Sequence, residues 1–365
     1  MVNLINDLKR HNGPLKAELE KATNRVIENG WYILGPEVES FEREFANYCG
    51  VDRCVTVANG TDALELALRT IGATAGDEII TVANAGMYST TAILAIGAQP
   101  VFADIDPASL TMSTTSFENA ISKNTKAVII THLYGQMADM PSLLAIAHRA
   151  QIPIIEDCAQ AHGAKLAGKR AGSWGELGCF SFYPTKNLGA LGDGGAVVTS
   201  NDQLADRLKQ MRQYGWESKY RSIIAGGRNS RLDEIQAAIL RVKLPQLDFW
   251  NQRRREIAKA YATGIRHPDI HHPVSFDESY IAHLYVLRTD KRESLRRHLK
   301  ENGIATDIHY PLPDYQQPFL KSRYEDIDLP NTETAAATVM TLPCFPEMTA
   351  TEVKHIIYTI DNWSS

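Results

Sequence analysis

A lysine and an aspartate stand at the ends of two runs that have the composition of buried strands. Lys186 follows the run Ser-Phe-Tyr-Pro-Thr at 181–185 and precedes a glycine-containing turn, and Asp157 ends the run Pro-Ile-Ile-Glu-Asp at 153–157. Pyridoxal phosphate chemistry requires an amine that forms a Schiff base and a carboxylate that keeps the ring nitrogen protonated. Each residue alone has an ordinary explanation, as a solvated lysine or a turn-forming aspartate. Together they suggest a pyridoxal phosphate site.

A second segment has the features of a phosphate site. Residues 55–62 read Val-Thr-Val-Ala-Asn-Gly-Thr-Asp, which predicts a strand followed by a helix that starts near Gly60 and Thr61. Free N–H groups and the positive end of the helix dipole attract an anion there, and glycine allows close approach. An ordinary helix cap at a βα turn would have the same sequence. Ser181, five residues before Lys186, could add a hydroxyl group to the same phosphate.

Composition narrows the class of protein. A chain of 365 residues with 44% hydrophobic residues suits two domains. A net charge of -5 with mixed signs argues against binding to nucleic acid or to a membrane surface. Five cysteines without a Cys-x-x-Cys pair indicate neither a disulfide framework nor a zinc site, and we expect no metal. No signal peptide and no apolar run of roughly 18 residues is evident, so we expect a cytoplasmic protein.

The order of elements predicts an α/β fold. Seven short apolar runs alternate with helical patterns, at 54–57, 78–82, 100–105, 127–133, 152–157, 178–183 and 195–199. Continuous hydrophobicity in such runs indicates a mainly parallel sheet with helices on both faces. After a helix at 231–242 the pattern changes to a charged helix near 251–261 and a helix at 292–299 between strand-like runs at 282–287 and 304–308. We therefore predict a large domain at 1–245 and a smaller α/β domain at 246–365.

Eight segments, in order, resemble the DegT/DnrJ/EryC1/StrS family of nucleotide-sugar aminotransferases. They are 30–38 (Gly-Trp-Tyr-Ile-Leu-Gly-Pro-Glu-Val), 59–64 (Asn-Gly-Thr-Asp-Ala-Leu), 75–79 (Ala-Gly-Asp-Glu-Ile), 132–136 (His-Leu-Tyr-Gly-Gln), 156–163 (Glu-Asp-Cys-Ala-Gln-Ala-His-Gly), 181–187 (Ser-Phe-Tyr-Pro-Thr-Lys-Asn), 192–196 (Gly-Asp-Gly-Gly-Ala) and 227–238 (Gly-Arg-Asn-Ser-Arg-Leu-Asp-Glu-Ile-Gln-Ala-Ala). The resemblance spans nearly the whole chain. It implies the fold type I of pyridoxal phosphate-dependent transferases, which aspartate aminotransferase shares.

The resemblance also implies roles for single residues. Lys186 matches the Schiff-base lysine, which then moves the proton between the substrate carbon and the cofactor. Asp157 matches the partner of the ring nitrogen, and Gln160 matches a residue near the 3-hydroxyl group of the cofactor. The residues that match the phosphate site are Gly60, Thr61 and Ser181. Asn229 matches an asparagine that reaches the phosphate from the neighbouring subunit, which implies a homodimer with shared active sites, although a turn residue would have the same context.

One loop departs from the common family pattern. Many relatives carry threonine followed by phenylalanine or tyrosine after the second strand, where this chain has Gly86, and the nearest aromatic residue is Tyr88. This loop and residues 309–317 resemble family members that act on 3-keto sugars. We therefore expect Tyr88, His309 and Tyr310 near the substrate. Four cations that follow the last predicted sheet strand could bind the pyrophosphate or could simply be solvated: Lys219, Arg221, Arg228 and Arg231.

The lysine at position 186 distinguishes transamination from another family reaction. Relatives that dehydrate or deoxygenate their sugars have histidine there, whereas this chain retains the lysine. The resemblance therefore implies that glutamate donates an amine to C3 of a dTDP-linked 3-keto-6-deoxyhexose. Two alternatives stay open at this point: amination of a 4-keto sugar at C4, and a regulator that binds pyridoxal phosphate without catalysis.

Overall fold

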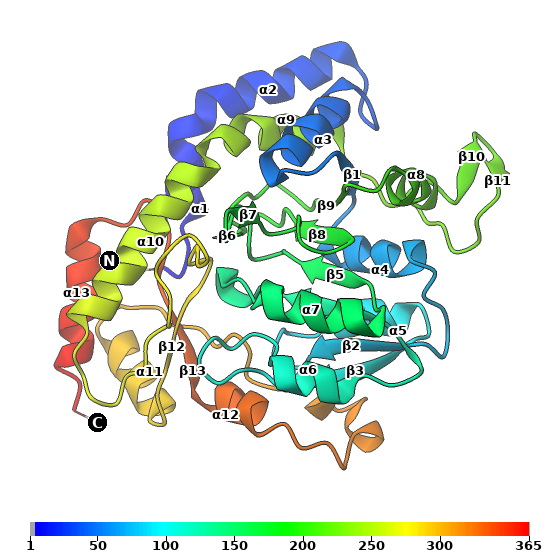
Figure 1. Cartoon of the computed structure of the whole chain (residues 1–365). Coiled ribbons are helices and arrows are strands. Elements are labelled where there is room, and N and C mark those ends of the chain that lie inside the picture. Colours follow the sequence, from blue (N-terminus) through cyan, green and yellow to red (C-terminus); the bar gives the residue numbers. More distant parts are fainter. Residues whose placement is uncertain (1–3, 365) are drawn as a thin grey trace.

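The computed structural model describes residues 4–364 and is built on one seven-stranded sheet (Figure 1). In spatial order the strands are β1 (Arg53–Val57), β9 (Gly195–Thr199), β8 (Leu177–Ser181), β5 (Ile154–Asp157), β4 (Thr125–Thr131), β2 (Glu78–Val82) and β3 (Gln99–Ala103). Strand β9 is antiparallel to β1 and β8, and the other neighbours are parallel. The prediction of seven strands in a mainly parallel sheet is confirmed.

Helices cover both faces of this sheet, which explains the uninterrupted apolar runs. In β4, Val128 and Ile130 face one hydrophobic core, and Ala127 and Ile129 face the other. The helices on the first face are α3 (Pro36–Cys49), α6 (Thr114–Ala120), α7 (Met140–Ala150) and α9 (Glu234–Lys243). Those on the second face are α4 (Gly60–Thr70), α5 (Tyr88–Ala95) and α8 (Asp202–Met211). Most residues of these strands lie between two helix layers and are apolar, so the alternation of a half-exposed strand is lost.

The N-terminal helices lie outside this sandwich. Helix α1 (Leu8–Asn12) leads to α2 (Lys16–Asn29), whose buried Ala22 and Val26 pack on Ala238 of α9. The short hairpin β6 (Lys165–Leu166) and β7 (Lys169–Arg170) lies between β5 and β8 in the sequence. A second hairpin, β10 (Trp216–Ser218) and β11 (Arg221–Ser222), follows α8 and projects from the body of the molecule, on the right in Figure 1.

The C-terminal elements form a hydrophobic core of their own. It contains residues of α10 (Leu247–Gly264), α11 (Arg292–Glu301), α13 (Ala350–Asp361), β12 (Tyr285–Arg288) and β13 (Val339–Leu342). Helix α10 joins the two parts, because Leu247 at its start belongs to the first core and Tyr261 near its end belongs to this one. This arrangement supports a domain boundary near residue 245, which stays a proposal. Helix α12 (Pro330–Thr338) returns to the large sheet, where Asp104 accepts hydrogen bonds from Thr332.

One predicted strand is wrong. Residues 304–308 do not form a strand: Asp307 makes a single bridge with Thr341. The partner of β12 is instead β13, in antiparallel register from Tyr285 opposite Leu342 to Arg288 opposite Val339. The segment after Ile304 stays beside β13 through this bridge, and its Ala305 and Asp307 line a cavity. Among residues 4–364, no helix is both long and apolar enough to cross a membrane.

Candidate active site

The carboxyl ends of the parallel strands and the start of α4 surround a cavity of about 540 Å³. Ends of neighbouring parallel strands meet at one edge of a sheet, which is where α/β folds place their sites. Six of the residues predicted from the sequence line this cavity together: Gly60, Thr61, Tyr88, Asp157, Ser181 and Lys186.

A second cavity of about 560 Å³ adjoins the first, and both are lined by Tyr88, Tyr183 and Lys186. Three further predicted residues, Gln160, His309 and Tyr310, line the second cavity. The lysine therefore faces two spaces. One is formed by the sheet and α4, and the other lies between the N-terminal and C-terminal parts, each of which supplies half of its lining residues. This is the arrangement that a group transfer between two bound molecules requires.

The start of α4 fits a phosphate group. Asn59 caps the helix by accepting from the N–H of Asp62 at 2.8 Å, while the N–H groups of Gly60 and Thr61 have no acceptor among the described residues. A Cβ atom at position 60 would lie 2.7 Å from Cβ of Ser181, so glycine is required for β8 to pass this close. The site therefore offers an anion two free N–H groups, the hydroxyl group of Ser181 and the positive end of the helix dipole.

Asp157 is a buried carboxylate that suits a protonated ring nitrogen. Its oxygens accept from the N–H of Ala159 at 3.1 Å, from Oγ1 of Thr131 at 3.4 Å and from Oγ of Ser89 at 3.5 Å. Burial raises the pKa of Asp157, and the hydrogen bond from Ala159 and the nearby Lys186 oppose this change. A cation at this position would be stabilised by a carboxylate that water does not screen.

Lys186 is tuned toward its neutral, nucleophilic form. Burial lowers the pKa of Lys186 from 10.5 to about 8, and the carboxylate of Asp157 opposes this shift. At pH 7.5 a group with this pKa is neutral in about a quarter of the molecules, whereas an unperturbed lysine is almost fully charged. The free amine can therefore attack a carbonyl group or accept a proton near neutral pH.

Gln160 and Tyr310 form the wall of the second cavity beside the loop that contains Gly86 and Tyr88. The amide oxygen of Gln160 accepts from the N–H of Tyr134 at 2.6 Å, and its Nε2 donates to the hydroxyl of Tyr310 at 3.1 Å. A Cβ atom at Gly86 would lie 2.8 Å from the ring of Tyr310. The ring of Tyr88 meets that of Tyr310 edge-on, with centroids 6.2 Å apart. Tyr310 thus occupies the space that a larger residue at position 86 would take.

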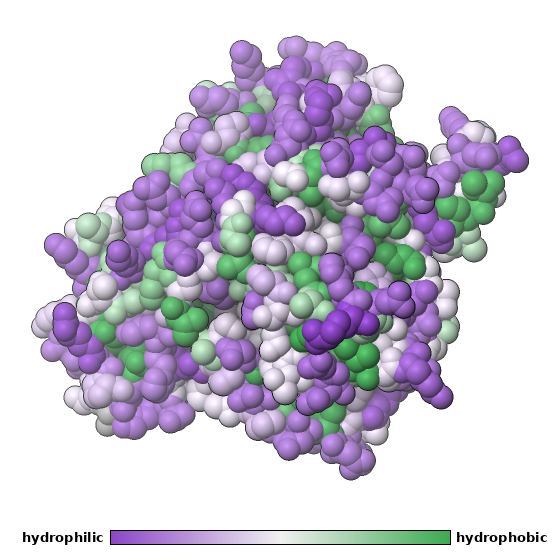
Figure 2. Space-filling view, viewed as in Figure 1, coloured by the Kyte–Doolittle hydropathy of each residue, from purple (hydrophilic) through white to green (hydrophobic). Residues whose placement is uncertain are grey.

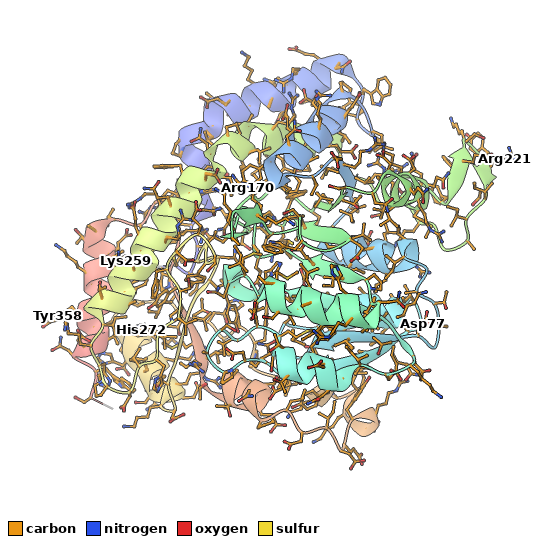
Figure 3. All side chains as sticks on the ribbon, in the orientation of Figure 1. Asp77, Arg170, Arg221, Lys259, His272 and Tyr358 are labelled. Atoms are coloured by element: carbon orange, nitrogen blue, oxygen red, sulfur yellow. The ribbon has the colours of Figure 1, made fainter. Side chains whose placement is uncertain are left out.

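Three predicted residues lie away from both cavities of their own chain. Asn229 is exposed, and Lys219 and Arg221 belong to the β10–β11 hairpin. Figure 3 shows Arg221 on this hairpin, far from the strand ends, and its guanidinium group is 2.7 Å from the carboxylate of Glu217. Figure 2 shows hydrophobic and hydrophilic atoms side by side on the hairpin. None of these three residues lines either cavity of its own chain.

Some cavity residues were not predicted. Tyr183 lines both cavities and could have been found, because it lies in the same motif as Lys186. The N-terminal residues Leu4, Ile5 and Asn6 also line the second cavity, and Nδ2 of Asn6 donates to the carbonyl of Thr185 at 3.3 Å. Their sequence carries no signal of this contact. His283, which also lines this cavity, lies in a run that indicates only a strand.

A buried cluster near the site has the residue types of metal ligands. His132, Glu156 and Cys158 place their ligand atoms within 4.8 Å of one another. However, Nδ1 of His132 accepts from the N–H of Ala138, and its Nε2 lies 2.9 Å from Oε2 of Glu156. The carboxylate of Glu156 also accepts from three N–H groups of residues 172–175. These lone pairs are already used, so the cluster acts as a structural network.

Comparisons with known proteins agree with this geometry. The model of the DegT/DnrJ/EryC1/StrS aminotransferase family matches residues 14–361. The chain is 46% identical to the dTDP-3-amino-3,6-dideoxy-alpha-D-galactopyranose transaminase of Aneurinibacillus thermoaerophilus, over 98% of both chains. It is 43% identical to the dTDP-3-amino-3,4,6-trideoxy-alpha-D-glucose transaminase of Streptomyces venezuelae, over 98% of this chain and 95% of that one.

The fold is also that of a solved relative. The crystal structure of S. venezuelae DesV in complex with a ketimine intermediate matches with a TM-score of 0.95 at 43% identity, over 98% of this chain and 97% of that one. The lysine, the buried carboxylate and the phosphate site described above are the parts that pyridoxal phosphate requires. The chain belongs to the DegT/DnrJ/EryC1/StrS aminotransferase family, whose cofactor is pyridoxal phosphate.

Proposed function

We propose that this protein transfers an amino group from glutamate to C3 of a dTDP-linked 3-keto-6-deoxyhexose, giving a 3-amino-3,6-dideoxy sugar. The observation that carries the proposal is the contact between Gly86 and the ring of Tyr310, which excludes a side chain at position 86. The aromatic ring that many relatives place there is replaced by Tyr310, which comes from the C-terminal part. The similar proteins named for 3-amino sugars support the same regiochemistry.

The residues of the chain divide the work between binding and proton transfer. The start of α4 and Ser181 hold the phosphate group, and Asp157 holds the proton of the ring nitrogen. Bound pyridoxal phosphate supplies an electron sink for the charge that develops at the reacting carbon. Lys186 takes a proton from that carbon or returns one to it, and its lowered pKa of about 8 suits both directions near neutral pH.

We propose a homodimer in which each active site uses two chains. Asn229, Lys219 and Arg221 lie away from their own cavities, so they would serve the site of the other subunit. Three exposed hydrophobic residues lie in and beside the hairpin, Tyr214, Tyr220 and Ile223, and Tyr220 is 80% exposed, so this arm offers apolar surface to a second subunit. Two cations on such an arm are suited to the pyrophosphate of a nucleotide sugar.

The compartment and the two-domain division are further parts of the proposal. The five cysteines are all buried free thiols, which suits a reducing compartment such as the cytoplasm. The separate core of the C-terminal elements supports a large domain at 1–245 and a small domain at 246–365.

One experiment tests the function and both alternatives. The protein loaded with pyridoxal phosphate is incubated with glutamate and, in parallel reactions, with the dTDP-linked 3-keto sugar or its 4-keto isomer, while absorbance follows the cofactor and nuclear magnetic resonance locates the new amine. We expect loss of the cofactor band with glutamate and an amine at C3. Amination of the 4-keto sugar alone, at C4, would establish the other regiochemistry. A cofactor spectrum that does not respond to any amino donor would instead favour the regulator.

A further inference from the structure

His283 contributes a ring to the second cavity, beside Lys186. It lies just before β12, and only 7% of its surface is exposed. Its Nδ1 is 2.9 Å from Oδ1 of Asn187, the residue that follows Lys186 in the sequence. The histidine is therefore tied by one hydrogen bond to the segment that carries the reactive lysine.

A chain of hydrogen bonds fixes the tautomer of this histidine. The chain starts at the carbonyl of His162, which can only accept, so Nδ2 of Asn251 donates to it at 2.7 Å. Oδ1 of Asn251 then accepts from Nδ2 of Asn187 at 2.8 Å. The remaining Oδ1 of Asn187 can only accept, so Nδ1 of His283 must carry the proton. Nε2 of the neutral ring is consequently a lone-pair acceptor.

The ring stays neutral, and Nε2 is free. Burial lowers the pKa of His283 well below its ordinary value, and the positive charges of Lys186 and Arg254 lower it further. Within residues 4–364, no group donates a hydrogen bond to Nε2 of His283, and this nitrogen is not fully buried. Nε2 is therefore accessible from the cavity and available to a donor that enters it.

The other histidine of the cavity lacks this constraint. Nδ1 of His309 is 2.7 Å from the hydroxyl of Thr341, which can donate or accept, and its Nε2 is 3.8 Å from the carboxylate of Asp307. Either nitrogen of His309 can carry the proton. Of the two rings, only His283 is held as a permanent acceptor toward the cavity.

We propose that His283 is a substrate-binding residue whose Nε2 accepts a hydrogen bond from a sugar hydroxyl next to the carbon that is aminated. This inference rests on the proposed function, because a nucleotide-linked hexose supplies hydroxyl donors on the carbons that flank its keto group. Lys186 must reach the reacting carbon, and Asn187 holds His283 beside that lysine. A neutral acceptor suits a hydroxyl group, because a charged imidazolium ring would have no lone pair to offer.

Two substitutions separate the two nitrogens of the ring. In His283→Asn, the amide replaces Nδ1 and can still donate to Asn187, but nothing replaces Nε2. In His283→Gln, the longer side chain brings an amide oxygen to the position of Nε2 and loses the bond to Asn187. We expect His283→Asn to weaken binding of the product, a dTDP-linked 3-amino-3,6-dideoxyhexose, about tenfold, and His283→Gln to weaken it by less than about threefold.

The measurement is calorimetric titration of each loaded enzyme, with dTDP alone as the control ligand. Affinity for dTDP should be the same in all three proteins. Equal affinity of His283→Asn and wild type for the sugar nucleotide, or a larger loss in His283→Gln than in His283→Asn, would overturn the inference. A loss for dTDP as large as for the sugar nucleotide would also overturn it. Failure of the proposed function is distinct, because the wild-type enzyme would then not bind or aminate the sugar nucleotide at all.

Discussion

Replacement of Gly86 by alanine tests the packing on which the proposed regiochemistry depends. Gly86 has φ +77°, a backbone conformation that side chains disfavour, and an added Cβ would lie 2.8 to 2.9 Å from three ring atoms of Tyr310. Ordinary contact begins at 3.4 Å, so the ring or the loop must move by about 0.6 Å. The hydroxyl of Tyr310 is held by Gln160 at 3.1 Å, so movement of the ring also disturbs the cavity wall.

Gly72 provides a matched control for the backbone cost. It has φ +80° and nothing within 4 Å of an added Cβ, so Gly72→Ala should lose only the conformational term of about 1–2 kcal/mol. Gly86→Ala carries the same term and an overpacking cost of about 1–3 kcal/mol. We therefore expect Gly86→Ala to be less stable than Gly72→Ala by about 1 kcal/mol or more. Because Tyr310 moves, KM for the sugar should also rise roughly tenfold.

Urea unfolding of the two loaded variants gives the stability difference, and steady-state kinetics with the sugar nucleotide gives KM. The half-reaction with glutamate should change much less than the sugar reaction. If Gly86→Ala and Gly72→Ala have the same stability and the same KM, the ring of Tyr310 does not fill the space at position 86, and the structural argument for C3 fails.

The remaining predictions concern Lys186, Asp157 and Asn229. Lys186→Ala should bind pyridoxal phosphate without turnover, and peptide mapping after borohydride reduction of the wild type should find the adduct on Lys186 alone. Asp157→Asn should lower turnover on the order of 10² or more, since the ring nitrogen loses its charged partner, and a near-normal kcat would contradict this role. Lys186→Ala mixed with Asn229→Asp should recover activity in heterodimers, and no recovery in verified heterodimers would place each site in one chain. In the folded protein without cofactor, the pKa of Lys186 is about 8, whereas an ordinary lysine has 10.5. Between these pH values the unfolded chain binds more protons than the folded chain, so the free energy of unfolding should rise with pH. Unfolding curves of Lys186→Ala should show a smaller rise.

The sheet could be predicted because burial on both faces leaves a direct mark on the sequence. Each strand between two helix layers is a short apolar run, as in β4 (Thr125–Thr131), and the polar residue that ends such a run, Asp157, lies at the edge where ligands bind. Strand pairing in the C-terminal part leaves no such mark. Residues 304–308 and β13 (Val339–Leu342) are both short apolar runs, and composition does not determine which of them pairs with β12.

The parts of the site that sequence patterns missed are contacts between distant segments. Asn6 meets Thr185 across 179 positions in the sequence, and no local pattern records such a contact. The same holds for His283, whose local run has the composition of a strand. Motifs reveal residues that lie on one turn or strand end, such as Gly60 and Thr61, because their chemistry depends on neighbours in the sequence.

Asn187 links the two halves of the site through adjacent positions in the chain. Its backbone follows Lys186, whereas its side chain accepts from His283 and donates to Asn251. Asn251 belongs to α10, the helix that joins the two hydrophobic cores. If the C-terminal part shifted, Nε2 of His283 could move relative to Lys186 only if these hydrogen bonds broke. Because the bonds are buried, breaking each of them costs free energy. The fold thus holds the ring that carries the proposed sugar acceptor in place relative to the backbone of Lys186.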